Sequence, residues 1–154
     1  MTRAVNTALA GSGGVLQVVQ GTSATQVINN TNSYVDSGLS ATLTPSSASS
    51  KILVISSVPF SYGTNGGSLE VNFQVVRGAT GVFETMAFNN VSAIVQLVTI
   101  AGISYFDSPN TTSSVTYKIQ FKERSASNRY GNTAVMPVNN TQSTGSIIIL
   151  EIAG

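Results

Sequence analysis

The side chains able to do acid–base chemistry in this sequence are six scattered carboxylates. They are Asp36, Glu70, Glu84, Asp107, Glu123 and Glu151. Histidine and cysteine are absent from the 154 residues, so the commonest general base, the best zinc ligands and all Ser-His or Cys-His nucleophiles are missing. The acids also lack the spacing of a calcium-binding loop. We therefore expect no enzyme activity, no metal site and no cofactor.

Glu70 and Glu84 are the one carboxylate pair for which a catalytic geometry can be imagined. They fall on neighbouring predicted strands, and a retaining glycosidase holds its two carboxylates ~5 Å apart. Acids at the exposed positions of alternating strands explain the same residues without catalysis. A hydrolase is accordingly the least favoured function.

Tyrosine and asparagine gather in the predicted loops. Hairpin turns explain the asparagines and glycines there. Tyrosine also offers an apolar face to a sugar ring, and asparagine supplies hydrogen bonds at low entropic cost. Both explanations stay open, and the candidate glycan contacts are Tyr62, Asn65, Arg129 and Tyr130.

The elements that would position these side chains are β-strands. Runs rich in Val, Ile, Thr, Phe and Tyr alternate with clusters of Ser, Asn, Gly and Thr, and no long stretch keeps a helical apolar period. The predicted strands cover residues 15–20, 25–29, 33–44, 51–60, 69–76, 82–88, 92–106 (one strand or two), 114–123, 133–138 and 146–152. About nine to eleven strands predict an antiparallel, jelly-roll-like β-sandwich.

Three local signals refine this prediction. Ser37-Gly38 interrupts the alternation of its strand and predicts a β-bulge. Pro59 has no N–H to donate, so it interrupts the hydrogen-bond ladder. Asn65-Gly66 tolerates the positive φ angles of a tight turn and predicts a hairpin between the strands that flank it.

Composition limits the class of protein and its partners. The length fits one domain, and charged residues are 8% against 42% hydrophobic residues, with a net charge of +1. The one basic cluster, over residues 118–129, is too small for a phosphate-binding surface, so no nucleic acid is expected. No signal peptide or membrane span is expected either. The predicted organisation is a flexible N-terminal arm, residues 1–14, followed by a single β-sandwich domain, residues 15–154.

Two predicted strands, 51–55 and 146–150, are apolar at successive positions and therefore on both faces. Packing between two sheets with a covering loop explains this pattern. Alternatively, one face packs inside the sandwich and the other contacts a sister subunit. Under the second explanation the interface residues are Ile52, Val54, Ile147 and Ile149.

The N-terminal arm also has two explanations. It is either a frayed end or a segment that orders on a partner and anchors the protein. Glycines in 11–14 would let it leave the domain at any angle. The candidate anchoring residues are Arg3, Val5 and Leu9.

Four segments in fixed order resemble small β-rich domains of phage virion structural proteins, above all those of marine and cyanobacterial phages. The segments are "GVLQVVQ", "SYVDSGLSATLTPSSASSKILV", "YFDSPNTTSSVTYKIQFK" and "STGSIIILEIAG". The resemblance implies a role on the virion surface and a homotrimer, and it brings no catalytic motif. Residues 62–100 match nothing in this pattern, so a fibre tip, a short fibre and a capsid decoration protein stay open.

The expected function is that of a non-enzymatic phage virion structural protein on the particle surface. It would be a capsid decoration (cement) or short-fibre protein, held by its N-terminal arm and by trimer contacts. The alternative is a tail-fibre module that binds host surface glycans through its Tyr/Asn-rich loops. The expected partners are further copies of the chain and capsid or tail proteins, with synthesis in the host cytoplasm.

Overall fold

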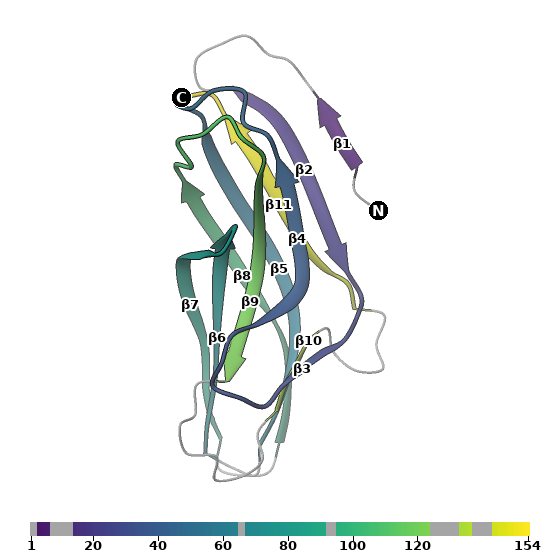
Figure 1. The fold of residues 1–154 in the computed structure, drawn as a ribbon. Helices are drawn as coiled ribbons and strands as arrows, with labels where there is room; N and C mark the ends of the chain where they lie inside the picture. The colour runs from purple at the N-terminus through teal and green to yellow at the C-terminus, as the bar shows by residue number, and fades with distance from the viewer. Residues whose placement is uncertain (1–2, 7–13, 65–66, 92–94, 124–132, 137–142) are drawn as a thin grey trace.

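The computed structural model describes residues 3–6, 14–64, 67–91, 95–123, 133–136 and 143–154. In these residues the chain forms eleven strands and no helix, in two antiparallel sheets (Figure 1). The strands are β1 (Arg3–Asn6), β2 (Val15–Ser23), β3 (Val27–Asn29), β4 (Val35–Leu43), β5 (Lys51–Thr64), β6 (Gly67–Arg77), β7 (Thr80–Val91), β8 (Val95–Asp107), β9 (Val115–Glu123), β10 (Thr133–Met136) and β11 (Gly145–Ile152). The prediction of an all-β sandwich is confirmed.

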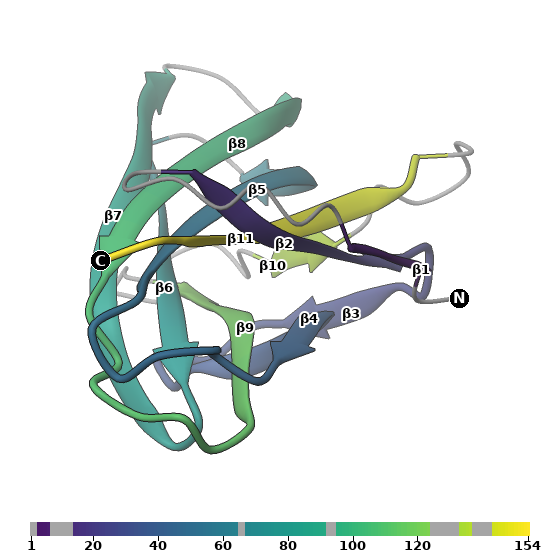
Figure 2. The same cartoon turned by 90° about the horizontal axis from the view of Figure 1, so that it is seen from above.

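The strands pair in a nested order. β2 pairs with β11, β4 with β9, β5 with β8 and β6 with β7, all antiparallel. Sheet A contains β2-β11-β5-β8, extended by β1, β10 and β3, and sheet B is β4-β9-β6-β7. Figure 2 shows these two layers from above. Pairing of first with last strand and so on inward is the arrangement of a jelly roll, as predicted.

The core lies between the two sheets, because alternate residues of each strand point inward. In β9 every second residue is buried, beginning with Val115 and including Tyr117 and Phe121. From β5 and β6, the rings of Phe60 and Phe73 meet edge to face, with centroids 5.2 Å apart. The strict alternation therefore gives each sheet one apolar inner face that the other sheet covers.

The bulge predicted in β4 is confirmed. The register between β4 and β9 shifts between Asp36 and Ser40, and Gly38 has a φ of 84°. Glycine adopts this left-handed conformation without the steric cost that a side chain would add. Residues on both sides of the shift keep the inward and outward alternation that the core requires.

The hairpin predicted at Asn65-Gly66 is wrong. The turn residues lie outside the described part of the chain, but the flanking strands belong to different sheets: β5 pairs with β8, β10 and β11, whereas β6 pairs with β7 and β9. The chain crosses between the layers here. Turn residues determine where the chain reverses. The sheet that each flanking strand joins is decided by the burial of that strand's inner face.

Pro59 marks a change of neighbour along β5. β11 pairs with Lys51–Ser57, and β10 takes over at Ser61–Gly63. Pro59 falls between the two on this edge, and on the other edge it lies opposite Ile100 of β8 within a pairing that runs without a register shift. A strand of fourteen residues can therefore have two consecutive partners along one edge.

Part of the predicted flexible arm forms a strand. Arg3–Asn6 forms β1, which pairs antiparallel with Gln17–Gln20 and lies outside β2 at the rim of sheet A (Figure 1). A free strand edge offers backbone hydrogen bonds to any extended segment nearby, which accounts for this pairing. The flexibility expected over residues 1–14 stays a prediction. Residues 7–13 lie outside the described part of the chain.

The first strands of the two sheets, β2 and β4, approach each other closely. A Cβ built on Gly21 would lie 1.9 Å from the backbone oxygen of Ser40. A backbone atom cannot move aside as the end of a side chain can. Glycine at position 21 is therefore required by the distance between the sheets.

We expect Gly21→Ala to lower the free energy of unfolding by about 2 kcal/mol or more, because the added methyl group forces the sheets apart. The matched control is Gly102→Ala in β8, where an added Cβ meets nothing within 4 Å and the expected change is under about 0.5 kcal/mol. Urea denaturation of both variants measures the difference. Equal stabilities would show that the sheets are not in close contact at Gly21.

Candidate functional site

The outward surface of sheet A is apolar. Leu53 on β5 lies between Leu150 on β11 and Phe106 on β8, and Ile55 lies opposite Ile148. We call this surface the apolar face and define it by Leu53, Ile55, Ile100, Phe106, Ile148 and Leu150. Ile100 is 64% exposed, Phe106 56% and Ile55 42%. Ser57, Gly102 and Ser104 separate Ile100 from the group around Leu53, Ile55 and Phe106. Clusters of exposed apolar side chains such as this group are typical of sites of association.

Charge is nearly absent from the apolar face. Among the described outward residues of β2, β11, β5 and β8, only Lys51 is charged, at the start of β5. Its Nζ donates to Ser108 Oγ at 2.9 Å, at the margin of the surface. A partner can therefore cover the face without desolvating an ionic group.

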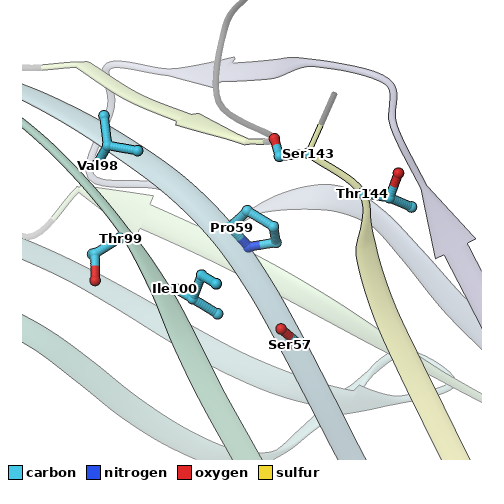
Figure 3. Close-up of a pocket in the computed structure, with 7 residues that line it drawn as sticks. All are labelled: Ser57, Pro59, Val98, Thr99, Ile100, Ser143 and Thr144. Atoms are coloured by element: carbon cyan, nitrogen blue, oxygen red, sulfur yellow. The ribbon is translucent and has the colours of Figure 1, made fainter. Parts of the chain in front are cut away.

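A pocket of about 620 Å³ continues the apolar face at its β10 end (Figure 3). It opens where β5 changes neighbour at Pro59, and Val98 and Ile100 from β8 form its opposite side. Ser57, Ser143 and Thr144 add hydroxyl groups, and Ser143 Oγ is buried with no hydrogen-bond partner in the described structure. The pocket has no titratable lining residue, so it offers space for an apolar group rather than acid–base chemistry.

The outward surface of sheet B has the opposite character. Lys118 Nζ lies 3.0 Å from the Asp36 carboxylate, and Gln120 Nε2 donates to it at 2.6 Å. Gln74 Nε2 donates in turn to Gln120 Oε1 at 2.6 Å. Burial alone would raise the pKa of Asp36, but the hydrogen bonds from Gln120 and Lys118 and the charge of Lys118 lower it. Many groups of this surface are polar and bond to one another, while Met86 and Phe88 of β7 add exposed apolar side chains beside them.

A second polar group lies beside the first on sheet B. Asn72 Nδ2 donates to Glu84 Oε1 at 2.6 Å, and Lys122 Nζ lies 4.5 Å from the ring centre of Tyr34. Burial, followed by the hydrogen bond and charge of Glu84, raises the pKa of Tyr34. The Tyr34 hydroxyl therefore stays protonated to a higher pH than an ordinary tyrosine hydroxyl.

The proposed carboxylate pair does not form. Glu84 lies opposite Gln74 and Glu70 opposite Phe88, so four residues of strand separate the two acids along the sheet. That offset corresponds to about 13 Å, against the ~5 Å of a retaining glycosidase. The prediction placed the residues on the correct neighbouring strands, and the register keeps them apart.

Asp107 joins the two sheets at one end of the sandwich. From β8 it accepts a 2.6 Å hydrogen bond from the hydroxyl of Tyr117 on β9, and Arg77 on β6 lies 2.9 Å away in a salt bridge. Burial raises the pKa of Tyr117, and the bond to Asp107 raises it further. The Asp107 carboxylate has a structural role, since both of its oxygens accept protein hydrogen bonds.

Glu151 is 1% exposed and fixes the turn that precedes β5. Its carboxylate accepts hydrogen bonds from the backbone N and the Oγ of Ser46, both at 2.6 Å, and from Gln17 Nε2 at 2.7 Å. Burial alone would raise the pKa of Glu151. The hydrogen bonds from Ser46 and Gln17 outweigh burial and lower it.

The predicted interface residues point to the wrong side of their strands. Ile52, Val54, Ile147 and Ile149 are all 0% exposed in the core of a single chain. A side chain without accessible surface cannot contact a second subunit. An apolar run indicates that both faces of a strand are covered, but it does not show which residues face the core. In β5 and β11 the outward residues are instead Leu53, Ile55, Ile148 and Leu150.

Sequence reasoning also missed Phe106, Ile100 and Val98 on the apolar face. The sequence could have shown this, because apolar residues occupy both sets of alternating positions in this strand. Residues 98, 100 and 106 belong to one set, and residues 101, 103 and 105 belong to the other. Both faces of this edge strand are therefore apolar, as in β5 and β11.

Most other predicted site residues cannot be placed. The side chains of Arg3 and Val5 and all of Leu9 lie outside the described part of the chain, so the anchoring role stays a prediction. The same holds for the glycan contacts: the side chain of Tyr62 and all of Asn65, Arg129 and Tyr130 are outside it. Both sets of site residues therefore stay predictions.

Two further searches of the described residues found no site. They contain no group of three or more acidic side chains placed to hold a metal ion. They also contain no helix of the length and apolarity that a membrane crossing requires.

Comparisons with known proteins give only distant similarities. No family model matches the chain, and no curated protein matches it. A solved structure of the insecticidal delta-endotoxin Cry8Ea1 from Bacillus thuringiensis is similar with a TM-score of 0.38 and 17% identity, over 84% of this chain and 20% of the toxin chain. A structure of infectious bursal disease virus, Gx strain, is similar with a TM-score of 0.39 and 12% identity, over 89% of this chain and 37% of that one. This chain spans a minor part of both, and similarities at this level assign no family or function.

We expect Glu151→Gln to lower the free energy of unfolding near pH 7 by about 1–3 kcal/mol, because an amide NH₂ would face donors that now share a carboxylate. The loss should shrink in acid. The pKa of Glu151 is lower in the folded than in the unfolded chain, so its stabilisation is present above the ordinary value of 4.5 and is lost as the pH falls through the folded pKa. Urea denaturation at neutral and acid pH measures both effects.

The control for this experiment is Asp36→Asn, which removes an exposed carboxylate whose pKa is also lowered. It should change stability by less than Glu151→Gln, because solvent screens the Asp36 interactions. If Glu151→Gln were as stable as the parent at neutral pH, the Ser46 and Gln17 bonds would not hold the turn.

Proposed function

We propose that the protein is a non-enzymatic structural protein of a phage virion, exposed on the particle surface and assembled through its apolar face. The observation that carries this proposal is the contrast between the two outward surfaces of the sandwich. The surface of sheet A has a central group of apolar side chains and almost no charge, whereas that of sheet B carries a hydrogen-bonded group of charged and amide side chains, with Met86 and Phe88 exposed on β7. Such a molecule has one side for neighbouring subunits and one side for solvent.

The energetics favour a second copy of the chain as the partner. Covering what is still exposed of Ile55, Val98, Ile100 and Phe106 contributes roughly 4 kcal/mol, at about 2 kcal/mol for each fully buried side chain. Association costs at least about 4 kcal/mol in lost freedom of motion. A polar partner would not offset that cost, whereas a second copy doubles the apolar contribution to about 8 kcal/mol. In the homotrimer that we propose, each subunit shares the face with two neighbours.

The role we propose is structural because the groups that could react are engaged elsewhere. Two of the three carboxylates that are buried among the described residues, Asp107 and Glu151, accept hydrogen bonds that hold turns and sheets together. The pocket beside the apolar face has no titratable lining residue. We therefore assign the polar surface of sheet B to solvent contact on the particle rather than to catalysis.

The four segments that resemble phage virion domains support the virion as the place of assembly. They include β2 and β11, which pair with each other in sheet A, and β4 and β9, which pair with each other in sheet B. Within the virion we propose a capsid decoration or short-fibre protein, with capsid or tail proteins as its further partners. β1, at the rim of sheet A, is the described part of the segment proposed to anchor it.

We expect Ile55→Asp to shift the protein from oligomer to monomer at micromolar concentration, because it places a charge at the centre of the apolar face. The matched control is Met86→Asp on the outward surface of sheet B, since Ile55 and Met86 are both 42% exposed. Sedimentation velocity should show an oligomer for the parent and for Met86→Asp. A parent protein that sediments as a monomer would contradict assembly through this face, and circular dichroism would check that both variants fold.

Location is tested separately from assembly. We expect mass spectrometry of purified particles to find the chain, and imaging with an antibody to place it on the capsid surface or on a fibre. Its presence in infected cells but not in washed particles would exclude a virion role. Such a result would leave the oligomer itself unaffected.

A further inference from the structure

β1 is attached to the domain by one edge. It pairs only with β2 among the described strands, over four of the nine residues of that strand. This attachment is made by antiparallel backbone pairing, in which Val5 lies opposite Val18. Backbone groups are the same in every copy, so the β2 edge of a neighbouring copy offers β1 the same hydrogen bonds.

Residues 7–14 connect β1 to β2, and their length decides how far β1 can reach. Eight residues span at most about 27 Å when extended and about 15 Å on average in a flexible, glycine-rich chain. Glycines stand at positions 11, 13 and 14. Two sheets packed face to face lie about 10 Å apart. A copy that packs against the apolar face with its β2 on the same side as this β2 therefore presents that strand within reach of the connection.

The β1 site is also continuous with the apolar face. Val18, the residue opposite Val5, lies opposite Leu150 of β11 on its other side, and Leu150 belongs to that face. Subunits that meet through the apolar face thus bring their β2 strands close to the contact. The strand edge and the face form one surface rather than two.

We propose that in the assembled protein β1 of one copy pairs with β2 of a neighbouring copy. This inference rests on the proposed assembly through the apolar face. Exchange keeps every β1–β2 hydrogen bond and adds a covalent connection that runs between subunits, as in domain swapping. Dissociation then requires both the face and the strand to separate, so exchange slows loss of subunits without any new contact. In a ring of three, each copy gives one strand and receives one.

The test uses the double variant Val5→Cys with Val18→Cys. The chain has no native cysteine, so no other disulfide competes. Directly opposed residues of antiparallel strands have Cα atoms about 4.5–5.5 Å apart, which a disulfide can bridge. The control pair, Gln20→Cys with Ile148→Cys, joins β2 to β11 within the domain. Both double variants are oxidised in the assembled state, and their remaining free thiols are then blocked. The products are run on a denaturing gel without reductant, and the native sample is analysed by sedimentation in parallel.

We expect most of the oxidised Val5→Cys/Val18→Cys protein to run as covalent dimers and trimers, and the control pair to run as a monomer. Disulfide-bonded monomers from an assembled sample would overturn strand exchange and leave the proposed function intact. Strand exchange would also be overturned if, in an assembled sample, the control pair formed its disulfide and the Val5→Cys/Val18→Cys pair formed none. A native sample that sediments as a monomer would instead overturn assembly through the apolar face, and the exchange with it.

Discussion

The pairing of β5 with β11 at the centre of sheet A is the constraint on which the rest of the structure depends. These two strands are apolar at successive positions, so each contributes side chains to both sides of the sheet. Ile52, Val54, Ile147 and Ile149 on one side complete the core against sheet B. Leu53, Ile55, Ile148 and Leu150 on the other side form the centre of the apolar face. One pair of strands thus determines both the interior and the surface of association.

The few charges of the chain are used to join the parts around this centre. Asp107 connects sheet A to Tyr117 and Arg77 of sheet B, and Glu151 connects β11 to the turn at Ser46 and to Gln17 of β2. A buried carboxylate is stable only when hydrogen bonds replace its lost hydration. Two of the six acids are committed to these bonds, which join neighbouring strands and sheets.

Local patterns predicted local structure well, and non-local pairing decided the rest. Strict alternation located β6 and β9, and Gly38 located the bulge in β4. The hairpin at Asn65-Gly66 failed because a turn signal carries no information about which sheet each strand joins. The pairing of Glu70 with Glu84 failed through register, which depends on both strands together. The prediction of the interface residues was wrong because an apolar run looks the same on both faces of its strand. Only the position of the opposite sheet decides which face lies in the core.

The contrast between the outward surfaces also accounts for how a chain with 8% charged residues can stay soluble. Sheet B presents Asp36, Lys118, Gln120 and Gln74, whose side chains bond to one another and to solvent. Sheet A presents a surface that water solvates poorly, and in the proposed assembly neighbouring copies remove it from water. Each copy then needs polar residues on one side only. Under the proposed assembly, the composition and the asymmetry of the sandwich would both follow from one requirement, that identical subunits cover the apolar face.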